Sequence, residues 1–179
     1  MKKMTMKTKN DIVCRDFAVV SKYENEEIIT PVRSTGLSAG YDIFNNGESF
    51  VIPAHGVSSA ISTKLKAYMQ PDEVLCIFVR SSMGFKKGVT LVQNVAIIDA
   101  DYVDNENNEG EIFLKFRNNS DEDVTIEKGS AFAQGMFQKY FLVDGDFYGN
   151  GSVRKGGVGS TDKTEKTKVE YQKHPIDEK

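Results

Sequence analysis

Two acidic residues and a tyrosine follow directly on an apolar segment, and residues of these types at this spacing could perform hydrolytic chemistry. Asp99, Asp101 and Tyr102 lie within Gln93–Ile112, which reads QNVAIIDADYVDNENNEGEI. The apolar residues before Asp99 predict a strand, the polar asparagine-rich stretch predicts a loop, and Gly110 leads into a returning strand, so we predict a hairpin. A carboxylate and an aromatic ring at such a tip could activate a water, support a sugar and hydrogen-bond a planar ring. An ordinary acidic turn is the alternative, because Asp, Asn and Gly are common turn residues.

Three polar positions within other apolar segments could bind phosphates or a cation. The small residues of Ala39–Ile43 (AGYDI) allow close backbone approach and present Asp42 at the start of a strand. Arg80–Ser82 (RSS) begins an expected helical turn, where serine groups bind anions and an arginine can fork onto a phosphate; helix capping by serine is the alternative. Gln134 interrupts an apolar strand, and its amide needs a partner in the protein or in a ligand.

A glycine-rich segment near the C-terminus has the composition of a phosphate-binding loop. Arg154–Thr161 (RKGGVGST) combines two cations, three glycines and two hydroxyls, which suit the wrapping of donors around phosphate oxygens. The segment does not fit the P-loop pattern GxxxxGK[ST]. A flexible linker is the alternative for this segment taken alone.

Length and composition restrict the class of protein. A chain of 179 residues with 39% hydrophobic residues is expected to form one globular domain, and a net charge of −3 argues against general nucleic-acid binding. The longest apolar run, Val74–Val79, is too short to span a membrane. Cys14 and Cys76 are far apart and favour a reducing cytosol. With only His55 and His174 besides, any bound metal is expected to be a hard cation held by oxygen atoms.

Short runs rich in Val, Ile, Phe and Tyr predict an all-β sandwich, jelly roll or barrel. One helical turn is expected across Ser82–Lys87. Residues 1–143 are expected to form the β domain, with residues 1–10 disordered, residues 144–162 a flexible glycine-rich arm and residues 163–179 a disordered charged tail. Besides the strand before Asp99, the expected strands are Ile12–Val20, Ile28–Val32, Tyr41–Phe44, Phe50–Ile52, Val57–Ile61, Glu73–Arg80, Val89–Val92, Glu111–Arg117, Asp123–Ile126 and Ala133–Val143.

Taken in order, AGYDI, RSS, IIDADY…GEI, FAQ and GGVGST resemble the five sequential motifs of the homotrimeric dUTP diphosphatase (dUTPase) family. The resemblance covers roughly Ala39 to Thr161, and the insertion between Tyr102 and Gly110 resembles that of Gram-positive bacterial and phage members. It implies a jelly-roll-like distorted β-barrel that forms a homotrimer, with active sites shared among subunits and closed by the arm. The implied reaction converts dUTP and water to dUMP and pyrophosphate with Mg²⁺ on the triphosphate, which keeps uracil out of DNA.

The resemblance also implies roles for individual residues. Asp99 matches the catalytic carboxylate that activates water, Tyr102 matches the ring beneath the deoxyribose, and Asp42 is implied to reach Mg²⁺ through water. The positions implied to contact the rest of the substrate are Gln93, Asn94 and Ile98 for the base, Arg80, Ser81, Ser82 and Gln134 for the phosphates, and Arg154, Val158, Gly159, Ser160 and Thr161 for closure of the arm.

Five positions depart from the family pattern and leave other functions open. Val158 stands where a phenylalanine usually stacks on the uracil, and Gln93 stands where an asparagine is common; the others are Ala96, Ala131 and Asp162. A dUTPase-fold regulatory or protein-binding module would explain softened base contacts. A dCTP deaminase shares the fold but is less favoured, because no deaminase motif is found. A purely structural β domain is the remaining alternative.

Overall fold

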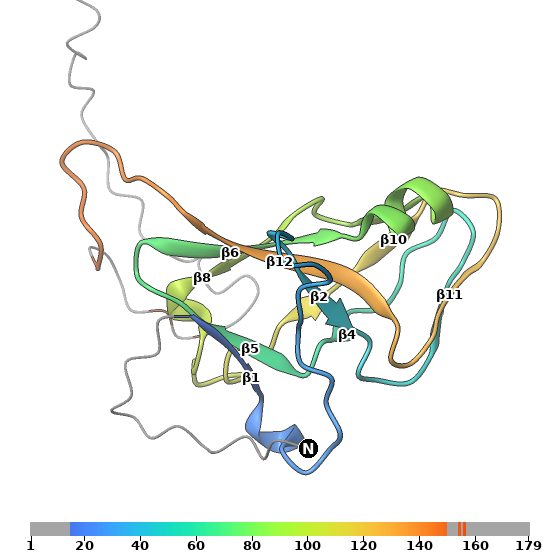
Figure 1. Ribbon diagram of the computed structural model, residues 1–179, viewed down its shortest axis with the longest axis horizontal. Helices are drawn as coiled ribbons and strands as arrows, with labels where there is room; N and C mark the ends of the chain where they lie inside the picture. The colour runs from blue at the N-terminus through green and yellow to red at the C-terminus, as the bar shows by residue number, and fades with distance from the viewer. Residues whose placement is uncertain (1–14, 150–153, 155, 157–179) are drawn as a thin grey trace, which may run out of the picture.

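The computed structural model describes residues 15–149 together with Arg154 and Gly156, and its regular structure is almost entirely β (Figure 1). The strands are β1 (Asp16–Val19), β2 (Tyr41–Phe44), β3 (Phe50–Ile52), β4 (Ile61–Ser62), β5 (Leu65–Tyr68), β6 (Glu73–Val79), β7 (Val89–Leu91), β8 (Ala96–Asp99), β9 (Phe113–Leu114), β10 (Phe116–Asn118), β11 (Val124–Ile126) and β12 (Ala131–Lys139). The short helical elements are the 3₁₀ turns η1 (Ser21–Tyr23) and η3 (Ala100–Tyr102) and the π-helical turn η2 (Ser82–Lys86).

The strands form one four-stranded sheet and smaller ladders around a common core. The larger sheet has the order β2-β12-β6-β8, and the two-stranded ladders are β1-β5, β10-β7, β11-β3 and β4-β9. Every pairing is antiparallel. The predicted all-β, jelly-roll-like class is therefore confirmed, although the ladders of the described residues remain separate sheets and do not close into one continuous barrel.

The core is apolar because the central strands bury residues on both faces. β6 reads EVLCIFV, and its Leu75 and Ile77 are fully buried on one face while Cys76 is buried on the other, because successive side chains of a strand point to opposite faces. Phe116 and Phe132 are also fully buried, with ring centroids 5.2 Å apart. This packing supplies most of the hydrophobic stabilisation and fixes the ends of β6, β8 and β12, where the polar residues of interest lie.

Local predictions differ from the structure at two segments. Ile28–Val32 is an irregular loop that makes only one isolated bridge, from Val32 to Asp42, so the expected strand there is wrong. β5 was not expected, because Lys66 interrupts its apolar pattern; the structure buries this lysine and pairs it with carboxylates. The helical turn after Ser81 is confirmed as η2.

Most of the expected arm and tail lies outside the described residues. Regular structure ends with β12 at Lys139, and residues 140–149 continue from it. The division into domain, arm and tail therefore stays a prediction. Within the described part of the chain, we find no helix with the length and apolarity needed to cross a membrane.

A buried lysine fastens the loop that follows Tyr102. Lys66 Nζ lies 2.6 Å from Asp104 Oδ1 and 2.6 Å from Glu109 Oε1. Burial alone would lower the pKa of Lys66, but the hydrogen bonds to both carboxylates outweigh burial and raise this pKa. Burial would raise the pKa of Glu109, but hydrogen bonds from Lys66 and Ser21 outweigh it and lower this pKa. The loop is thus held by charge-assisted bonds in a partly buried setting.

The lowered pKa of Glu109 predicts a pH-dependent contribution to stability. Its folded pKa lies below the unfolded value, so the contribution is complete above the unfolded value and is lost as pH falls through the folded one. We expect Glu109→Gln to lower the free energy of unfolding by about 1 kcal/mol at neutral pH, with the difference disappearing as pH falls through the folded pKa of Glu109. Urea unfolding measures this, with Glu106→Gln as the matched control on the exposed side of the same loop. A difference that is constant across this pH range would contradict the assignment.

Candidate active site

Asp99 lies at the end of β8, where the larger sheet ends. β8 pairs with β6, and the Cα partner of Asp99 is Val74. The Asp99 side chain is 51% exposed, so its carboxylate is open to a ligand or a water. Ala96, at the start of β8, is buried in the core and anchors the strand.

The hairpin predicted around Asp99 is wrong. β8 pairs with β6, whereas the returning chain forms β9, which pairs with β4, and β10, which pairs with β7. The chain changes direction because η3 follows Asp99 immediately and places Tyr102 in the interior. Asp99 therefore stands at a sheet edge beside a compact loop, and the two limbs of the segment are held by different sheets.

Asp99, Asp101, Tyr102 and Arg154 form one group, here called the carboxylate cluster. Arg154 Nε lies 2.8 Å from Asp101 Oδ1, and the Arg154 Nη2 group pairs with Asp99. The guanidinium carbon lies 5.7 Å from the centre of the Tyr102 ring, within the range of a cation–π contact. Only 14% of the Arg154 side chain is exposed, so a residue far along the chain is held against the acids by charge and by the ring face.

Asp42, Arg80 and Gln134 form a second group, here called the Asp42 cluster. Arg80 Nε lies 2.9 Å from Asp42 Oδ1, and the Ser34 hydroxyl donates to the other carboxylate oxygen. Gln134 is the β12 partner of Asp42, and its amide donates to the Val79 carbonyl at 3.4 Å. A side chain at Gly40 would approach Gln134 Oε1 to 3.0 Å, so the small residues of AGYDI do allow the predicted close approach.

The serines after Arg80 and the residues before β8 complete the predicted set. Ser81 is the N-cap of η2 and is exposed, and its side chain makes no cap hydrogen bond, so capping does not account for it. Gln93 and Asn94 are exposed in a tight turn, where Asn94 has a φ of +63°. This turn precedes β8 and so lies at the opposite end of that strand from Asp99. Ile98 is half-buried in β8 beside Leu75.

The two clusters lie far apart within one chain. Asp99 is opposite Val74, six positions before Arg80 along β6 and its continuation. At about 3.3 Å per residue, this corresponds to a separation of about 20 Å. One triphosphate bound at Arg80 would therefore not reach Asp99 of the same chain. Val158, Gly159, Ser160 and Thr161 lie outside the described residues.

The metal-binding capacity of the described residues is limited to isolated carboxylates. No group of three or more His, Cys, Asp or Glu side chains suited to a metal ion occurs among them. Both oxygens of Asp42 already accept bonds, from Arg80 and Ser34. Such residues fit a magnesium ion that takes its ligands mainly from substrate phosphates and water, and they do not form a closed protein cage.

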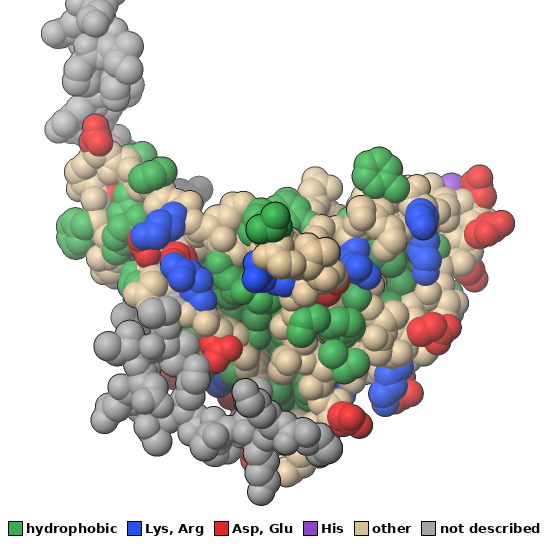
Figure 2. Space-filling model, viewed as in Figure 1, with side chains coloured by type: hydrophobic (Ala, Val, Ile, Leu, Met, Phe, Trp, Pro, Cys, Tyr) green, Lys and Arg blue, Asp and Glu red, His purple; other side chains and the backbone are tan. Residues whose placement is uncertain are grey.

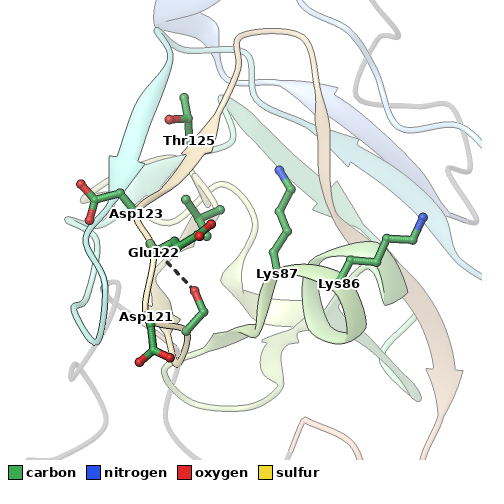
Figure 3. Close-up of a pocket in the computed structure, with 8 residues that line it drawn as sticks. Lys86, Lys87, Asp121, Glu122, Asp123 and Thr125 are labelled. Atoms are coloured by element: carbon green, nitrogen blue, oxygen red, sulfur yellow. Dashed lines mark hydrogen bonds between the residues drawn. The ribbon is translucent and has the colours of Figure 1, made fainter.

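A groove of about 580 Å³ is lined by no residue of either cluster (Figure 3). Lys86 and Lys87 of the η2 region line it on one side, and Asp121, Glu122 and Asp123 line it on the other. Its charges are mixed and it contains none of the predicted site residues. This groove is therefore not the place where the predicted residues meet.

Sequence reasoning missed two residues that the structure brings next to Tyr102: Asn108 and the Glu111 carbonyl both hydrogen-bond its hydroxyl. Asp101, which the sequence pointed to together with Asp99, shares Arg154 with it. The asparagines of the loop were interpreted only as turn formers. Their number was the available signal, because repeated amides within a short loop can satisfy one another and a neighbouring hydroxyl.

Fold and site together define an all-β protein with a half-exposed carboxylate at a sheet edge and a second cluster in which an arginine is paired with a carboxylate beside an amide. Comparison with known proteins identifies the family to which this all-β protein belongs. The dUTPase family model matches residues 26–161. The deoxyuridine 5′-triphosphate nucleotidohydrolase of Lactococcus lactis is 48% identical over 82% of this chain and 97% of its own length. The chain belongs to the dUTPase family, and it is an enzyme of the dUTP nucleotidohydrolase type.

Solved structures agree with this assignment. The dUTPase of Streptococcus mutans superposes with a TM-score of 0.64 at 41% identity, covering 72% of this chain and 98% of that one. A mutant dUTPase of phage phi11 of S. aureus has a TM-score of 0.59 at 19% identity over 73% of this chain and 93% of its own, and shares the fold. The predicted similarity to Gram-positive members is confirmed by the Lactococcus and Streptococcus relatives.

Gly110 lies next to the loop beside the carboxylate cluster, in a backbone conformation and with close contacts that leave no room for a side chain. Its φ is +81°, and a Cβ there would lie 2.7 Å from Val103 Cα and 2.9 Å from the Tyr102 carbonyl oxygen, both backbone atoms. We expect Gly110→Ala to lower the free energy of unfolding by about 2 kcal/mol or more, because strain and overlap add. Thermal unfolding measures this, with Gly149→Ala as control, since that glycine has a similar φ of +85° but open space around it. Equal losses in both variants would show that overlap contributes nothing.

Proposed function

We propose that this enzyme hydrolyses dUTP to dUMP and pyrophosphate by attack of water on the α-phosphorus, with Asp99 as the general base. The new bond forms between the water oxygen and the α-phosphorus, and the bond to the α–β bridging oxygen breaks, releasing pyrophosphate. The observation that carries the proposal is the half-exposed Asp99 carboxylate at the end of β8, in a chain 48% identical to a dUTPase. A placed carboxylate of this kind can take a proton from an attacking water. Removal of dUTP in this way would keep uracil out of DNA.

The Asp42 cluster is proposed to bind the triphosphate. Arg80 and the hydroxyls of Ser81 and Ser82 offer charge and donors at the end of β6, and Gln134 offers an amide beside them. Mg²⁺ on the triphosphate would neutralise part of its charge. Asp42 would face that ion through water, since its own oxygens are engaged by Arg80 and Ser34.

Base and sugar are proposed to be recognised near β8. Tyr102 would lie beneath the deoxyribose, and Gln93, Asn94 and Ile98 would contribute to the base site. Val158 would replace an aromatic face with an aliphatic one over the uracil, and this weakens stacking. The base is therefore proposed to be bound mainly by the residues in and before β8, and less by the arm residue Val158.

Arg154 is proposed to exchange partners during the reaction cycle. Its guanidinium bonds Asp99 and Asp101. A triphosphate offers denser negative charge in the same fork geometry, so the guanidinium would transfer to phosphate oxygens and leave Asp99 to the attacking water. Gly159, Ser160 and Thr161 would supply further donors and exclude bulk water as the arm closes.

The active site is proposed to be shared between copies of the chain in a homotrimer. The separation of about 20 Å between Asp99 and Arg80 along β6 supports this, because one chain cannot present both to one triphosphate. Residues 140–148, which follow β12, also expose a series of large apolar side chains, among them Phe141 (95% exposed), Val143 and Phe147. Figure 2 shows hydrophobic side chains gathered at the end of the molecule where this segment lies. Such a series is typical of a surface that another subunit covers.

Mixing two inactive variants tests the shared site. We expect Asp99→Asn and Arg80→Gln to be inactive alone and to recover about a quarter of wild-type activity when unfolded, mixed equally and refolded, because a random trimer restores one site in four. The glutamine keeps a donor for Asp42, which limits unfolding. The measurement is pyrophosphate release per chain, with each variant refolded alone as control. Full absence of recovery from correctly folded mixed trimers would place both residues in sites confined to one chain.

A nucleotide panel tests the reaction and the role of Asp99. With Mg²⁺, wild-type protein is expected to release pyrophosphate from dUTP and much less from UTP, dTTP or dCTP. Asp99→Asn should lower that rate by at least about a hundredfold without unfolding the protein. Glu122→Gln, an exposed acid away from both clusters, should leave the rate unchanged. Ammonia release from dCTP, or unchanged activity in Asp99→Asn, would contradict the proposal.

A further inference from the structure

The loop Val103–Glu109, here called the asparagine loop, has a defined structure, and its hydrogen bonds extend to Tyr102. Lys66 of β5 bonds Asp104 and Glu109, the residues near its two ends, each at 2.6 Å. Both of these acids have positive φ, +56° and +59°, which a non-glycine residue adopts only when its surroundings compensate. The loop is therefore closed by one lysine and held in a single shape.

The amides inside the asparagine loop satisfy one another and the backbone. Asn105 is buried; its Oδ1 accepts from the backbone N–H groups of Asn107 and Asn108, and its Nδ2 donates to the Tyr102 carbonyl at 2.8 Å. Asn105 Nδ2 also donates to Asn108 Oδ1 at 2.7 Å. Asn105 thus forms the inside of the turn and places the side chain of Asn108.

Asn108 connects this hydrogen-bond network to the Tyr102 hydroxyl. Its Nδ2 group donates to Tyr102 Oη at 2.9 Å and to the Glu111 carbonyl at 3.3 Å, and the Tyr102 hydroxyl donates to that same carbonyl at 2.9 Å. The three groups form a closed triangle in which the tyrosine oxygen both donates and accepts. Tyr102 is 8% exposed, so little water competes for these bonds.

The carbonyl in this triangle is itself fixed. The Glu111 side chain is buried, lies 2.6 Å from Lys22 Nζ, and accepts from the hydroxyls of Tyr23 and Ser62. These partners belong to η1 and β4, which are distant in sequence. The tyrosine hydroxyl is therefore fastened to the body of the domain as well as to the loop.

A hydroxyl held in this way fixes the position of the ring. The Tyr102 oxygen lies on the axis about which the ring turns, so the triangle sets where the ring lies relative to Asp99, three residues earlier. The Arg154 guanidinium lies 5.7 Å from the ring centre. A displacement of a few tenths of an ångström at this ring would change the space left for the sugar beside it.

We propose that Asn108 is a positioning residue for sugar selection: it holds the Tyr102 ring where a 2′-deoxyribose fits and a ribose does not. This inference rests on the proposed function, in which Tyr102 lies beneath the sugar. It assigns the asparagine loop a part in choosing deoxynucleoside over ribonucleoside triphosphates, exerted through the tyrosine hydroxyl.

The chain offers a matched pair of variants for the test. Asn108→Ala removes the donor to Tyr102, whereas Asn107→Ala changes a neighbouring, exposed asparagine whose backbone N–H alone enters the network. We expect Asn108→Ala to reduce the ratio of kcat/KM for dUTP to that for UTP by roughly threefold to tenfold, mainly through KM for dUTP. Asn107→Ala should retain the wild-type ratio.

A double-mutant cycle separates positioning from general loss of structure. Tyr102→Phe removes the hydroxyl while leaving Asn108 bonded to the Glu111 carbonyl, and it is expected to reduce the ratio to a similar extent. Adding Asn108→Ala to Tyr102→Phe should then change the ratio little, because both act through one contact. Independent, multiplying effects of the two substitutions would overturn the inference, as would equal ratios for Asn108→Ala and Asn107→Ala.

Two further outcomes are distinguishable. Should Asn108→Ala fail to fold, Asn108→Asp keeps the acceptor that holds Asn105 and Gly110 but loses the donor, and it must still reduce the ratio for the inference to stand. A wild-type enzyme with no preference for dUTP over UTP would contradict the proposed function itself. A preference that survives in Asn108→Asp and Tyr102→Phe would contradict only the positioning role.

Discussion

The pairing of β8 with β6 is the constraint on which the rest of the site depends. It places Asp99 opposite Val74, at one end of a strand with a buried centre whose other end leads to Arg80. Because that strand is hydrogen-bonded to β12 on one side and to β8 on the other, the separation of about 20 Å cannot be closed by a local motion. The proposed catalytic carboxylate and the proposed phosphate-binding cluster must therefore belong to different sites of one chain, and this is the physical basis for proposing that neighbouring chains complete each site.

The two ends of β6 have similar electrostatics. Each cluster places an arginine against a carboxylate, Arg80 with Asp42 and Arg154 with Asp99 and Asp101. These pairs neutralise the acids while no phosphate is bound, and they hold guanidinium groups that a triphosphate can recruit. Substrate binding would then replace the carboxylates on these arginines with phosphates. Because the arginine side chains are already ordered, they would lose less conformational entropy on binding than free side chains would.

The residue types of the candidate site were predictable because they stand in short contiguous motifs, whereas their roles stay predictions. The all-β class followed from short β-branched runs, and η2 followed from the residues after Arg80. The pairing of β8 was not predictable, because the alternation of polar and apolar residues shows which face of a strand is buried but not which strand lies beside it. The hairpin expected from Gln93–Ile112 failed for this reason. β5 was missed because a buried lysine looks like an exposed one until its carboxylate partners are known.

The sequence by itself determined the family, the fold class and the chemical types at Asp99, Tyr102, Arg80 and Gln134, since these depend on residue identity and order along the chain. Only the tertiary structure decided that Asp99 and Arg80 lie at opposite ends of β6, that Arg154 bonds Asp99 and Asp101, and that Asn108 holds the Tyr102 hydroxyl. These are contacts between residues whose distance is set by strand pairing and loop closure. Side-chain hydrogen bonds act over about 3 Å, so they cannot be assigned until the backbone has been placed.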